Sequence, residues 1–407
     1  MGNGSERVKN KDNSYGKIPN KPVSLNGQNI DEVSTFRYLG LELSKDCTSG
    51  VCIKDLYKRA LKAFFKLTKS FDQLPSIRTL AHLYDHLIKP VGMYGCEIWG
   101  PINLNTKSVK KPASEYGAFH ANLREKYPII SQYLKRDDPL EKLHLKFCKF
   151  SLGVHAKTSN MAVYGDLGRY PLFIDEIVST IKYFYHLEDS TENKILQKLY
   201  RTLKGNKQML KNDNIISFSH KVHNICGIPL PSNRKMERNI LIKIKKKLQQ
   251  NFASYWSLVT NTSLSRQNRG GNKLRTYIIF KKHFHREEYL NIANPSARRT
   301  IAKFRLSAHK LRIESARYDC RNKYIPPEER ICTNCDQSKT EDEFHFLLHC
   351  PKYNDLWKKL YETISLNNRI FTDYNDQHKF IWLMSNKNLS DIKSLASFIE
   401  TGMSLTR

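Results

Sequence analysis

Three cysteines and a histidine near the C-terminus have the spacing of a metal site. Cys332 and Cys335 are separated by two residues, the spacing with which a tight turn directs two thiolates at one ion. His345 follows after nine residues and Cys350 after four more. Three thiolates and one imidazole suit the tetrahedral coordination of Zn²⁺. His349 is an alternative nitrogen ligand, because it lies in the same short segment.

A site with four protein ligands has no open position for water. The pattern therefore predicts a structural zinc ion and not a catalytic one. The acidic residues Glu341, Asp342 and Glu343 precede His345, and we expect them to be solvated on the surface of a zinc knuckle. Phe344 and Phe346 have two interpretations: they stack on unpaired bases, or they pack the small core of the knuckle.

The charge of the chain favours a polyanionic partner. Sixty-eight Lys and Arg against 39 Asp and Glu, over 407 residues, give a formal net charge of +29. Each cation that neutralises a phosphate releases a condensed counterion, so this surplus predicts binding to RNA or DNA. A membrane surface is a weaker expectation, because no amphipathic helix gathers the charge and no run of ~18 apolar residues exists.

The cysteine usage predicts a reducing compartment. Six of the nine cysteines lie outside the zinc motif and are scattered, which does not suit a disulfide framework. The polar N-terminal stretch lacks the apolar centre of a secretory signal. We therefore expect an intracellular protein, nuclear or cytoplasmic. The basic run at residues 243–247 is either a nuclear address or a solvated helix face.

The patterning predicts a mainly α (α+β) fold. Asn26-Gly27 between short apolar stretches predicts a hairpin, and residues 36–43 predict a further strand with Gly40 at a bulge or at a close backbone approach. From residue 53 the apolar period is helical, with lysines forming a basic stripe on the opposite side. A second helix is expected from a cap at Ser76 to Pro90, and Trp99 is expected to pack in the core.

Further helices are predicted downstream of the polar region that follows residue 100. They are expected from Pro139 onward and near residues 160–167, 172–187, 236–257 and 296–316. Asp137-Asp138, the only Asp-Asp pair in the sequence, precedes the first of these helices. We interpret this pair as a helix N-terminal cap and not as a catalytic group.

Several motifs, in this order, resemble the C-terminal part of non-LTR (LINE-type) retrotransposon reverse transcriptases. The sequence FRYLG and the basic helix after it resemble the segment that follows the polymerase palm, and the Cys332–Cys350 pattern resembles the family's terminal zinc segment. The matching stretches lie at residues 36–40, 87–99, 143–154, 158–160, 309–318, 325–330 and 332–353, in the order that the family has them.

The resemblance implies a helical thumb-like bundle with a small N-terminal β-hairpin and a C-terminal zinc knuckle. In the family the thumb grips the template–primer duplex, and the zinc region helps to engage element RNA or target DNA. The phosphate contacts expected here are basic residues on the thumb-like helix and beside the zinc segment: Lys58, Lys62, Lys66, Arg298, Arg299, Lys303, Lys310 and Arg312.

The expected domain organisation follows from these elements. It comprises a disordered segment (1–22), a post-palm strand pair with thumb-like helices (23–100), a polar excursion (101–138) and a helical middle region (139–257). A basic linker (258–295), the zinc-binding region (296–365) and a helical tail (366–407) complete it.

The chain departs from the family in lacking the catalytic carboxylates. Polymerases hold two metal ions with aspartates, two of which lie in an aromatic-x-Asp-Asp hairpin in this family. That hairpin is absent from the sequence. We therefore expect a nucleic-acid-binding module that is inactive alone, either a truncated or a separately encoded part of a retroelement protein. A polymerase region in another chain is a candidate partner. The alternatives are a standalone enzyme, as a cryptic nuclease or divergent polymerase, and an inactive relic of a retroelement.

Overall fold

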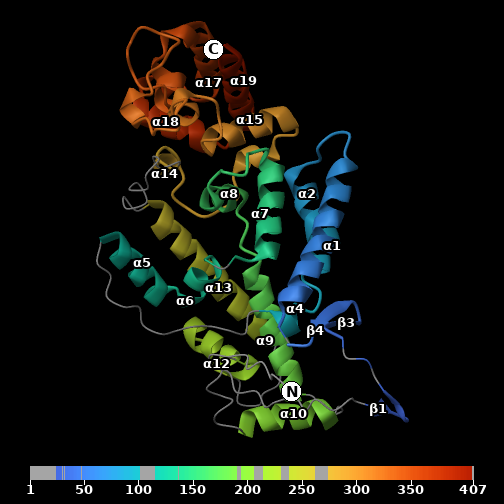
Figure 1. Ribbon diagram of the computed structural model, residues 1–407. Coiled ribbons are helices and arrows are strands. Elements are labelled where there is room, and N and C mark those ends of the chain that lie inside the picture. The colour runs from blue at the N-terminus through green and yellow to red at the C-terminus, as the bar shows by residue number, and fades with distance from the viewer. Residues whose placement is uncertain are drawn as a thin grey trace. The chain divides into compact units, whose positions relative to one another are not determined.

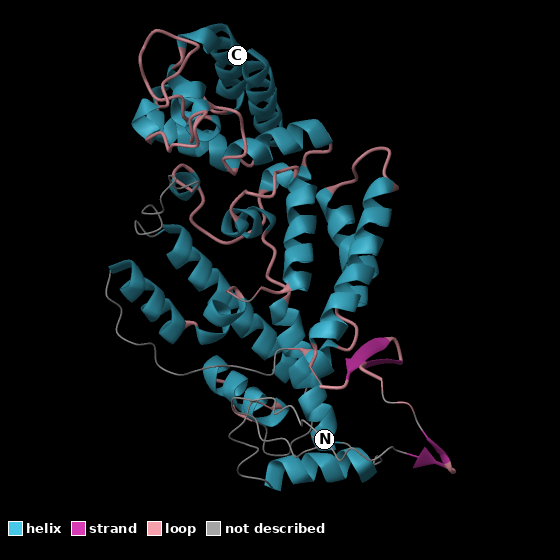
Figure 2. Cartoon of the chain, viewed as in Figure 1, coloured by secondary structure: helices cyan, strands magenta, loops and turns pink. Residues whose placement is uncertain are grey.

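A computed structural model describes residues 24–29, 31, 33–46, 48–100, 115–135, 137–189, 194–205, 214–230, 238–261 and 274–405. The chain forms two compact units, residues 1–51 and 52–407. The predicted disordered segment, residues 1–22, lies outside the described residues. Figure 2 shows the described strands in the N-terminal unit, whereas the second unit consists of helices and loops.

The first unit contains two antiparallel hairpins. Strands β1 (Ser24–Leu25) and β2 (Gln28–Asn29) pair around Asn26 and Gly27, whose φ angles are 50° and 79°. Positive φ at both turn positions is the geometry that Asn-Gly favours, so the predicted hairpin is confirmed.

The strand predicted at residues 36–43 is wrong. The chain instead forms β3 (Thr35–Tyr38) and β4 (Leu41–Ser44), which pair with each other. Leu39 and Gly40 have φ angles of 46° and 82° and make the two-residue turn between them. The glycine therefore closes a hairpin and does not form a bulge, and a leucine occupies a backbone region that favours Asn or Gly.

The second unit is helical, as predicted (Figure 1). Its described helices run in chain order as α1 (Gly50–Lys69), α2 (Ile77–Leu83), η1 (Tyr84–Ile88), α3 (Lys89–Gly92), α4 (Cys96–Trp99), α5 (Glu115–Lys126), α6 (Pro128–Tyr133), α7 (Pro139–Leu152), α8 (Asn160–Leu167), α9 (Phe173–Asp189), α10 (Lys194–Gly205), α12 (Ile215–Cys226) and α13 (Arg238–Asn261). They continue as α14 (Tyr277–Phe280), η3 (Glu288–Asn291), α15 (Pro295–Arg305), α16 (Arg312–Ser315), η4 (Pro327–Glu329), η5 (His345–His349), η6 (Pro351–Tyr353), α17 (Asn354–Asn367), η7 (Phe371–Asp373), α18 (Asp376–Ser385) and α19 (Leu389–Leu405).

The helix caps follow the sequence at two sites. Ser76 accepts a hydrogen bond from the backbone N–H of Thr79 at 3.1 Å, and Asp138 accepts one from Leu140 at 2.8 Å. Both predicted N-terminal caps are therefore confirmed, and Trp99 is buried as expected. Pro90 does not end its helix, because the π turn η1 breaks the ladder just before it. Proline then falls in the first turn of α3, where its missing N–H has no helical partner to lose.

Two regions expected to be irregular contain packed helices. The predicted polar excursion includes α5 and α6, which bury Leu123, Ile129 and Ile130. The predicted basic linker includes the end of α13 and the whole of α14, and its Tyr277 and Tyr289 side chains are fully enclosed. Apolar and aromatic side chains spaced among polar ones supply the buried area in both regions. Residues 274–295 are therefore part of the packed unit and not a linker.

The single helix predicted at residues 296–316 is wrong. Helix α15 ends at Arg305, Ser307 adopts a φ of 49°, and the short α16 begins at Arg312.

Among the described residues, no helix is both long enough and apolar enough to cross a membrane.

A buried carboxylate ties the break after α15 to the core. Asp166 of α8 accepts hydrogen bonds from Arg305 at 2.9 and 3.0 Å, from Tyr277 at 3.0 Å and from Tyr289 at 2.9 Å. Burial would raise the pKa of Asp166, but the Arg305 guanidinium holds it below its usual value. This network joins α8, α14 and α15, and so positions the segment that leads into the predicted zinc region.

Candidate metal centre

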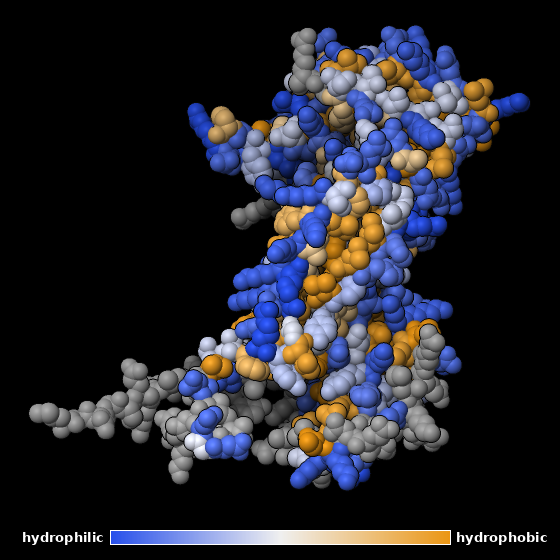
Figure 3. Space-filling view, turned by 90° about the vertical axis from the view of Figure 1, so that its right-hand side faces the viewer, coloured by the Kyte–Doolittle hydropathy of each residue, from blue (hydrophilic) through white to orange (hydrophobic). Residues whose placement is uncertain are grey.

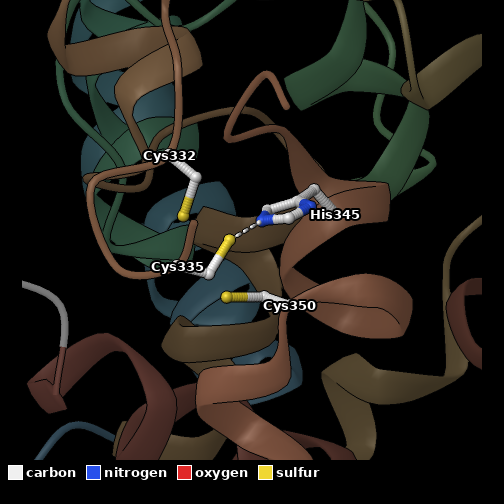
Figure 4. A group of neighbouring side chains, drawn as sticks. All are labelled: Cys332, Cys335, His345 and Cys350. Carbon is white, nitrogen blue, oxygen red and sulfur yellow. Dashed lines mark hydrogen bonds between the residues drawn. The ribbon is translucent and has the colours of Figure 1, made fainter. Parts of the chain in front are cut away.

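Cys332, Cys335, His345 and Cys350 converge at one point (Figure 4). Each offers one ligand atom, and these atoms all lie within 4.8 Å of one another. Sγ of Cys335 lies 3.3 Å from Nε2 of His345. Three of the four side chains are buried and that of Cys335 is partly exposed. The cluster can therefore hold a metal ion, and its donor set suits Zn²⁺.

A short antiparallel pairing positions the first two cysteines. Ile331 pairs with Thr340, and the backbone N–H of Cys332 donates to the carbonyl of Lys339 at 2.8 Å. Inside this loop the backbone N–H of Asn334 donates to Sγ of Cys332 at 3.4 Å. Backbone donors of this kind stabilise a thiolate, which is the form that binds a metal.

A π turn positions the other two ligands. His345 and Cys350 lie at the start of η5 and immediately after it, and the Cys350 N–H donates to the His345 carbonyl at 2.8 Å. The carboxylate of Asp342 accepts a hydrogen bond from the His345 N–H at 2.8 Å, which orders the start of the turn. This turn brings both side chains to the same side of the backbone (Figure 4).

The structure chooses between the two candidate histidines. Nε2 of His349 lies 2.8 Å from the carboxylate of Asp376 on α18, whereas the cysteine cluster includes His345. Burial lowers the pKa of His345 and so favours the neutral imidazole, the form that donates a lone pair to a metal. His345 is therefore the better nitrogen ligand.

Without a cation between them, each ionised thiol makes ionisation of the other thiols less favourable. Burial raises the pKa of Cys350 to about 12, and nearby Cys332 and Cys335 add to the effect. A divalent cation among the sulfur atoms reverses this balance, since thiolates are the ligating form and their protons leave on binding. The chemistry of the donor set therefore fits a zinc ion.

The acidic run before His345 is not solvated, contrary to the prediction. Glu341 accepts hydrogen bonds from the backbone of Arg312 and the side chain of Asn334, both at 2.7 Å. Glu343 is almost completely buried and pairs with Arg275 and His309. These carboxylates act as internal acceptors, which removes the cost of burying them and fixes the metal segment to its surroundings.

The two phenylalanines of the segment pack the protein. Phe346 is fully buried against Phe304, Tyr353 and Phe398. Phe344 stacks on Phe380, with ring centroids 4.0 Å apart. The packing alternative therefore describes both residues.

The basic residues expected to contact phosphate divide into two groups. Lys58, Lys62 and Lys66 on α1 are exposed, as are Lys303 and Lys310. Arg298 is 1% exposed and donates to the carbonyls of Ile292 at 2.8 Å and Pro75 at 3.0 Å. The expectation of a phosphate contact at Arg298 is therefore wrong, because its guanidinium is enclosed and satisfied by backbone acceptors.

Arg299 and Arg312 have structural contacts as well. Arg299 donates to the Phe150 carbonyl at 3.3 Å, and its guanidinium lies 5.8 Å from the centroid of the Phe150 ring. The half-buried Arg312 uses its backbone N–H to anchor Glu341. The sequence shows where the arginines occur but not which of them point into the protein. The packing of α15 against α7 is needed to show that.

Sequence reasoning also missed the partners that support the metal segment. Arg275 and His309 lie far from the ligand motif in the sequence, and no local pattern joins them to Glu343. The one signal in the sequence was the acidic run itself. Three carboxylates next to metal ligands need cations or backbone N–H groups nearby if they are buried.

Comparison with known proteins gives one partial similarity. No protein-family model and no solved structure matches the chain. Over 81 residues, or 19% of the chain, the sequence is 30% identical to the probable RNA-directed DNA polymerase from transposon BS of Drosophila melanogaster. The matched stretch spans 9% of that protein's length. The similarity supports, at this coarse level, a relation to a transposon polymerase.

Proposed function

We propose that this chain is the nucleic-acid-binding C-terminal portion of a retrotransposon RNA-directed DNA polymerase. In this proposal the helical region grips the template–primer, and a structural zinc ion orders the segment that engages RNA or target DNA. The partial similarity to a transposon polymerase supports the assignment. The observation that carries it is the exposed lysine row of α1.

The lysine row consists of Lys58, Lys62 and Lys66. Residues four apart on a helix lie on one face, with about 6 Å of axial rise between them. The three ammonium groups therefore form a linear array that can neutralise successive phosphates of a strand. Among the described residues no ion pair is formed by these lysines. The neighbouring acid, Asp55, is paired with Arg59 at 3.0 Å.

A second basic helix lies beside α1. Phe64 of α1 packs edge-to-face on Phe150 of α7, with ring centroids 5.8 Å apart. Exposed Lys146 of α7 places its ammonium 4.3 Å from the centroid of the Phe65 ring on α1. Figure 3 faces the side that carries α1 and α2, where hydrophilic side chains border an apolar band. Cations from two helices thus contribute to one face, which suits a polyanion.

The zinc ion has a structural role in this proposal. Four protein ligands complete its coordination, and the buried carboxylates Glu341 and Glu343 connect the ligand loop to the helices around it. A structural zinc contributes its binding energy to the folding of the segment.

Polymerase chemistry is proposed to come from carboxylates in another polypeptide or region. The single Asp-Asp pair of the sequence contributes Asp138 as a helix cap, and this aspartate is buried. We propose a reducing compartment, nuclear or cytoplasmic, because the cysteines outside the zinc motif are scattered along the sequence.

Titration of the purified chain with a labelled RNA hairpin and a DNA duplex, over a series of salt concentrations, tests this function. We expect the logarithm of the affinity to fall steeply and linearly with the logarithm of the salt concentration. A parallel primer-extension reaction with magnesium and nucleotides is expected to give no product. Absence of binding at low salt would reject the proposal, and magnesium-dependent extension would assign catalysis to the chain itself.

A further inference from the structure

A cavity of about 550 Å³ lies beside α18, and neither the cysteine cluster nor the lysine row uses it. Its wall includes Tyr374, His378 and Trp382, and Asn386 and Lys387 border it. This volume falls within the roughly 300–1,000 Å³ of pockets that take small organic groups. The lining is mostly apolar and aromatic, which suits a flat ring system better than an ion.

The aromatic wall is held in place from behind. Phe371 is fully buried and contacts Trp382 and Tyr374, with ring centroids 4.9 and 6.1 Å away. Asn375 caps α18 by accepting the backbone N–H of His378 at 2.9 Å, which orders the turn between Tyr374 and His378. The cavity wall is therefore organised before any ligand arrives, so binding requires little additional ordering.

The charge at the cavity suits a phosphate. Lys387 is exposed, and no carboxylate occurs among the cavity's lining residues. Two of the nearby carboxylates have other partners: Asp376 contacts His349 at 2.8 Å, and buried Asp391 accepts hydrogen bonds from Asn367 and Asn386. Exposed Asp373 precedes Tyr374 and lies outside the cavity lining. Two other cavities of the second unit include carboxylates in their walls. One lies beside α4 and α9, and in the other, around Arg169, the cations Lys89, Arg169 and Lys245 are already paired with aspartates.

We propose that this cavity binds an unpaired nucleotide of single-stranded RNA or DNA. The base stacks against the rings of Trp382 and Tyr374, and Lys387 neutralises the adjoining phosphate. Every base has a π face, so such a site accepts single strands with little dependence on sequence. The inference rests on the proposed function and adds to it a separate single-strand site, remote in sequence from the duplex-binding lysines of α1.

Fluorescence anisotropy with four probes tests the site. The probes are labelled oligothymidylate, labelled oligouridylate, and blunt-ended DNA and RNA hairpins whose loop nucleotides are replaced by a non-nucleotide linker. We expect Trp382→Leu to weaken single-strand binding by about 5- to 100-fold and to change hairpin binding less than about twofold. Lys387→Ala should weaken single-strand binding and reduce its salt dependence. Matched controls are Trp357→Leu and Lys359→Ala, on α17, which lie outside the cavity lining.

The outcomes separate this site from the proposed function. Unchanged single-strand binding by Trp382→Leu, with hairpin binding intact, rejects the cavity alone. A wild-type chain that binds none of the four probes rejects the proposed function as well. If Trp382→Leu fails to fold, photocrosslinking of the wild-type chain to 5-iodouracil oligonucleotides tests the site instead. An adduct within residues 374–387 supports the site, and adducts confined elsewhere overturn it.

Discussion

Partly buried Arg275 and fully buried Glu343 form an ion pair through two hydrogen bonds, with Nη2 of the arginine 2.7 and 2.8 Å from the carboxylate oxygens. His309 adds a third contact to the same carboxylate at 2.9 Å. Glu343 lies two positions before the proposed zinc ligand His345. The segment that carries the proposed metal ligands is therefore joined by charged side chains to Arg275 and His309, which lie far from it in the sequence. A displacement of either part would weaken these contacts.

Replacing Glu343 with glutamine should destabilise the protein. Although burial opposes ionisation, Arg275 and His309 hold the pKa of Glu343 well below its usual value, so the native residue is charged. Glu343→Gln leaves Arg275 with Glu314 as its remaining ion-pair partner among the described residues. Loss of one partner of a buried pair costs about 3–5 kcal/mol, measurable by urea denaturation. The control Asp355→Asn, at an exposed pair, should stay within about 0.5 kcal/mol. Equal effects of the two substitutions would contradict the assignment.

Paired substitutions can distinguish the proposed zinc ligands from neighbouring residues of the same type. Cys335→Ser and His345→Ala should abolish zinc retention, measured by metal content after dialysis, because each removes one of four ligands. Cys226→Ser and His349→Ala should retain zinc, since Cys226 is buried outside the cluster and His349 pairs with Asp376. The matched pairs are Cys335→Ser with Cys226→Ser and His345→Ala with His349→Ala. Loss of zinc from both variants of a pair would refute the ligand set. Chelation of wild-type zinc should unfold the local segment, seen as loss of amide protection around residues 331–350.

The carboxyl group of Glu141 should make stability depend on pH. Burial raises its pKa to about 7 in the folded protein, against 4.5 for the unfolded chain, although Tyr164 and the Leu172 N–H donate to it. The folded state therefore holds the proton more tightly. The stabilisation that Glu141 contributes is complete below about pH 4.5 and is lost as the pH rises through about 7, amounting to roughly 3–3.5 kcal/mol.

Glu141→Gln imitates the protonated form and should remove this part of the pH dependence. The quantity to measure is the difference in unfolding free energy between variant and wild type from pH 5 to 8, in which effects of zinc release cancel. Glu362→Gln, at an exposed position of α17, is the control and should follow the wild type. Parallel curves for wild type and Glu141→Gln would show that Glu141 has an ordinary pKa.

A close contact at Gly165 should make this position intolerant of a side chain. A Cβ atom there would lie 2.6 Å from the ring of Trp256 and 2.6 Å from the hydroxyl of Tyr277. Gly165→Ala should therefore cost about 1–3 kcal/mol through overpacking. Gly205→Ala, where a Cβ meets nothing within 4 Å, should be neutral or slightly stabilising. The stabilities of the two variants are measured by thermal denaturation. A Gly165→Ala variant as stable as the wild type would contradict the close contact at Gly165.

Local signals predicted much of the helical fold. The predicted helix at residues 160–167 matches α8, and the apolar positions Leu56, Ala60 and Phe64 of α1 are buried as its periodicity indicates. Ser76 and Asp138 cap the helices they precede. These features depend on residues within one or two turns of one another, which is the range over which a sequence pattern carries information.

Features that depend on distant contacts could not be predicted in this way. The irregular pattern of residues 274–295 hides side chains such as Tyr277 and Tyr289, whose hydroxyls bond to Asp166 more than a hundred positions away. Arg298 was expected at the surface, because a cation is usually solvated. Its guanidinium is instead buried and donates hydrogen bonds to two backbone carbonyls. The ligand set was accessible because its spacing is local, whereas the choice of His345 over His349 required the position of Asp376 on α18.

The most direct test of the central proposal is the salt dependence of duplex binding by a triple variant of α1. Lys58→Gln, Lys62→Gln and Lys66→Gln together should reduce the slope of log affinity against log salt by about 2.7, since each phosphate that a lysine neutralises adds about 0.9 to the slope. A control triple at exposed Lys352, Lys359 and Lys393 makes the same change in charge elsewhere and should leave the slope close to that of the wild type. Equal slopes for the wild type and the α1 variant would contradict the proposal, because the lysine row would then neutralise no phosphate.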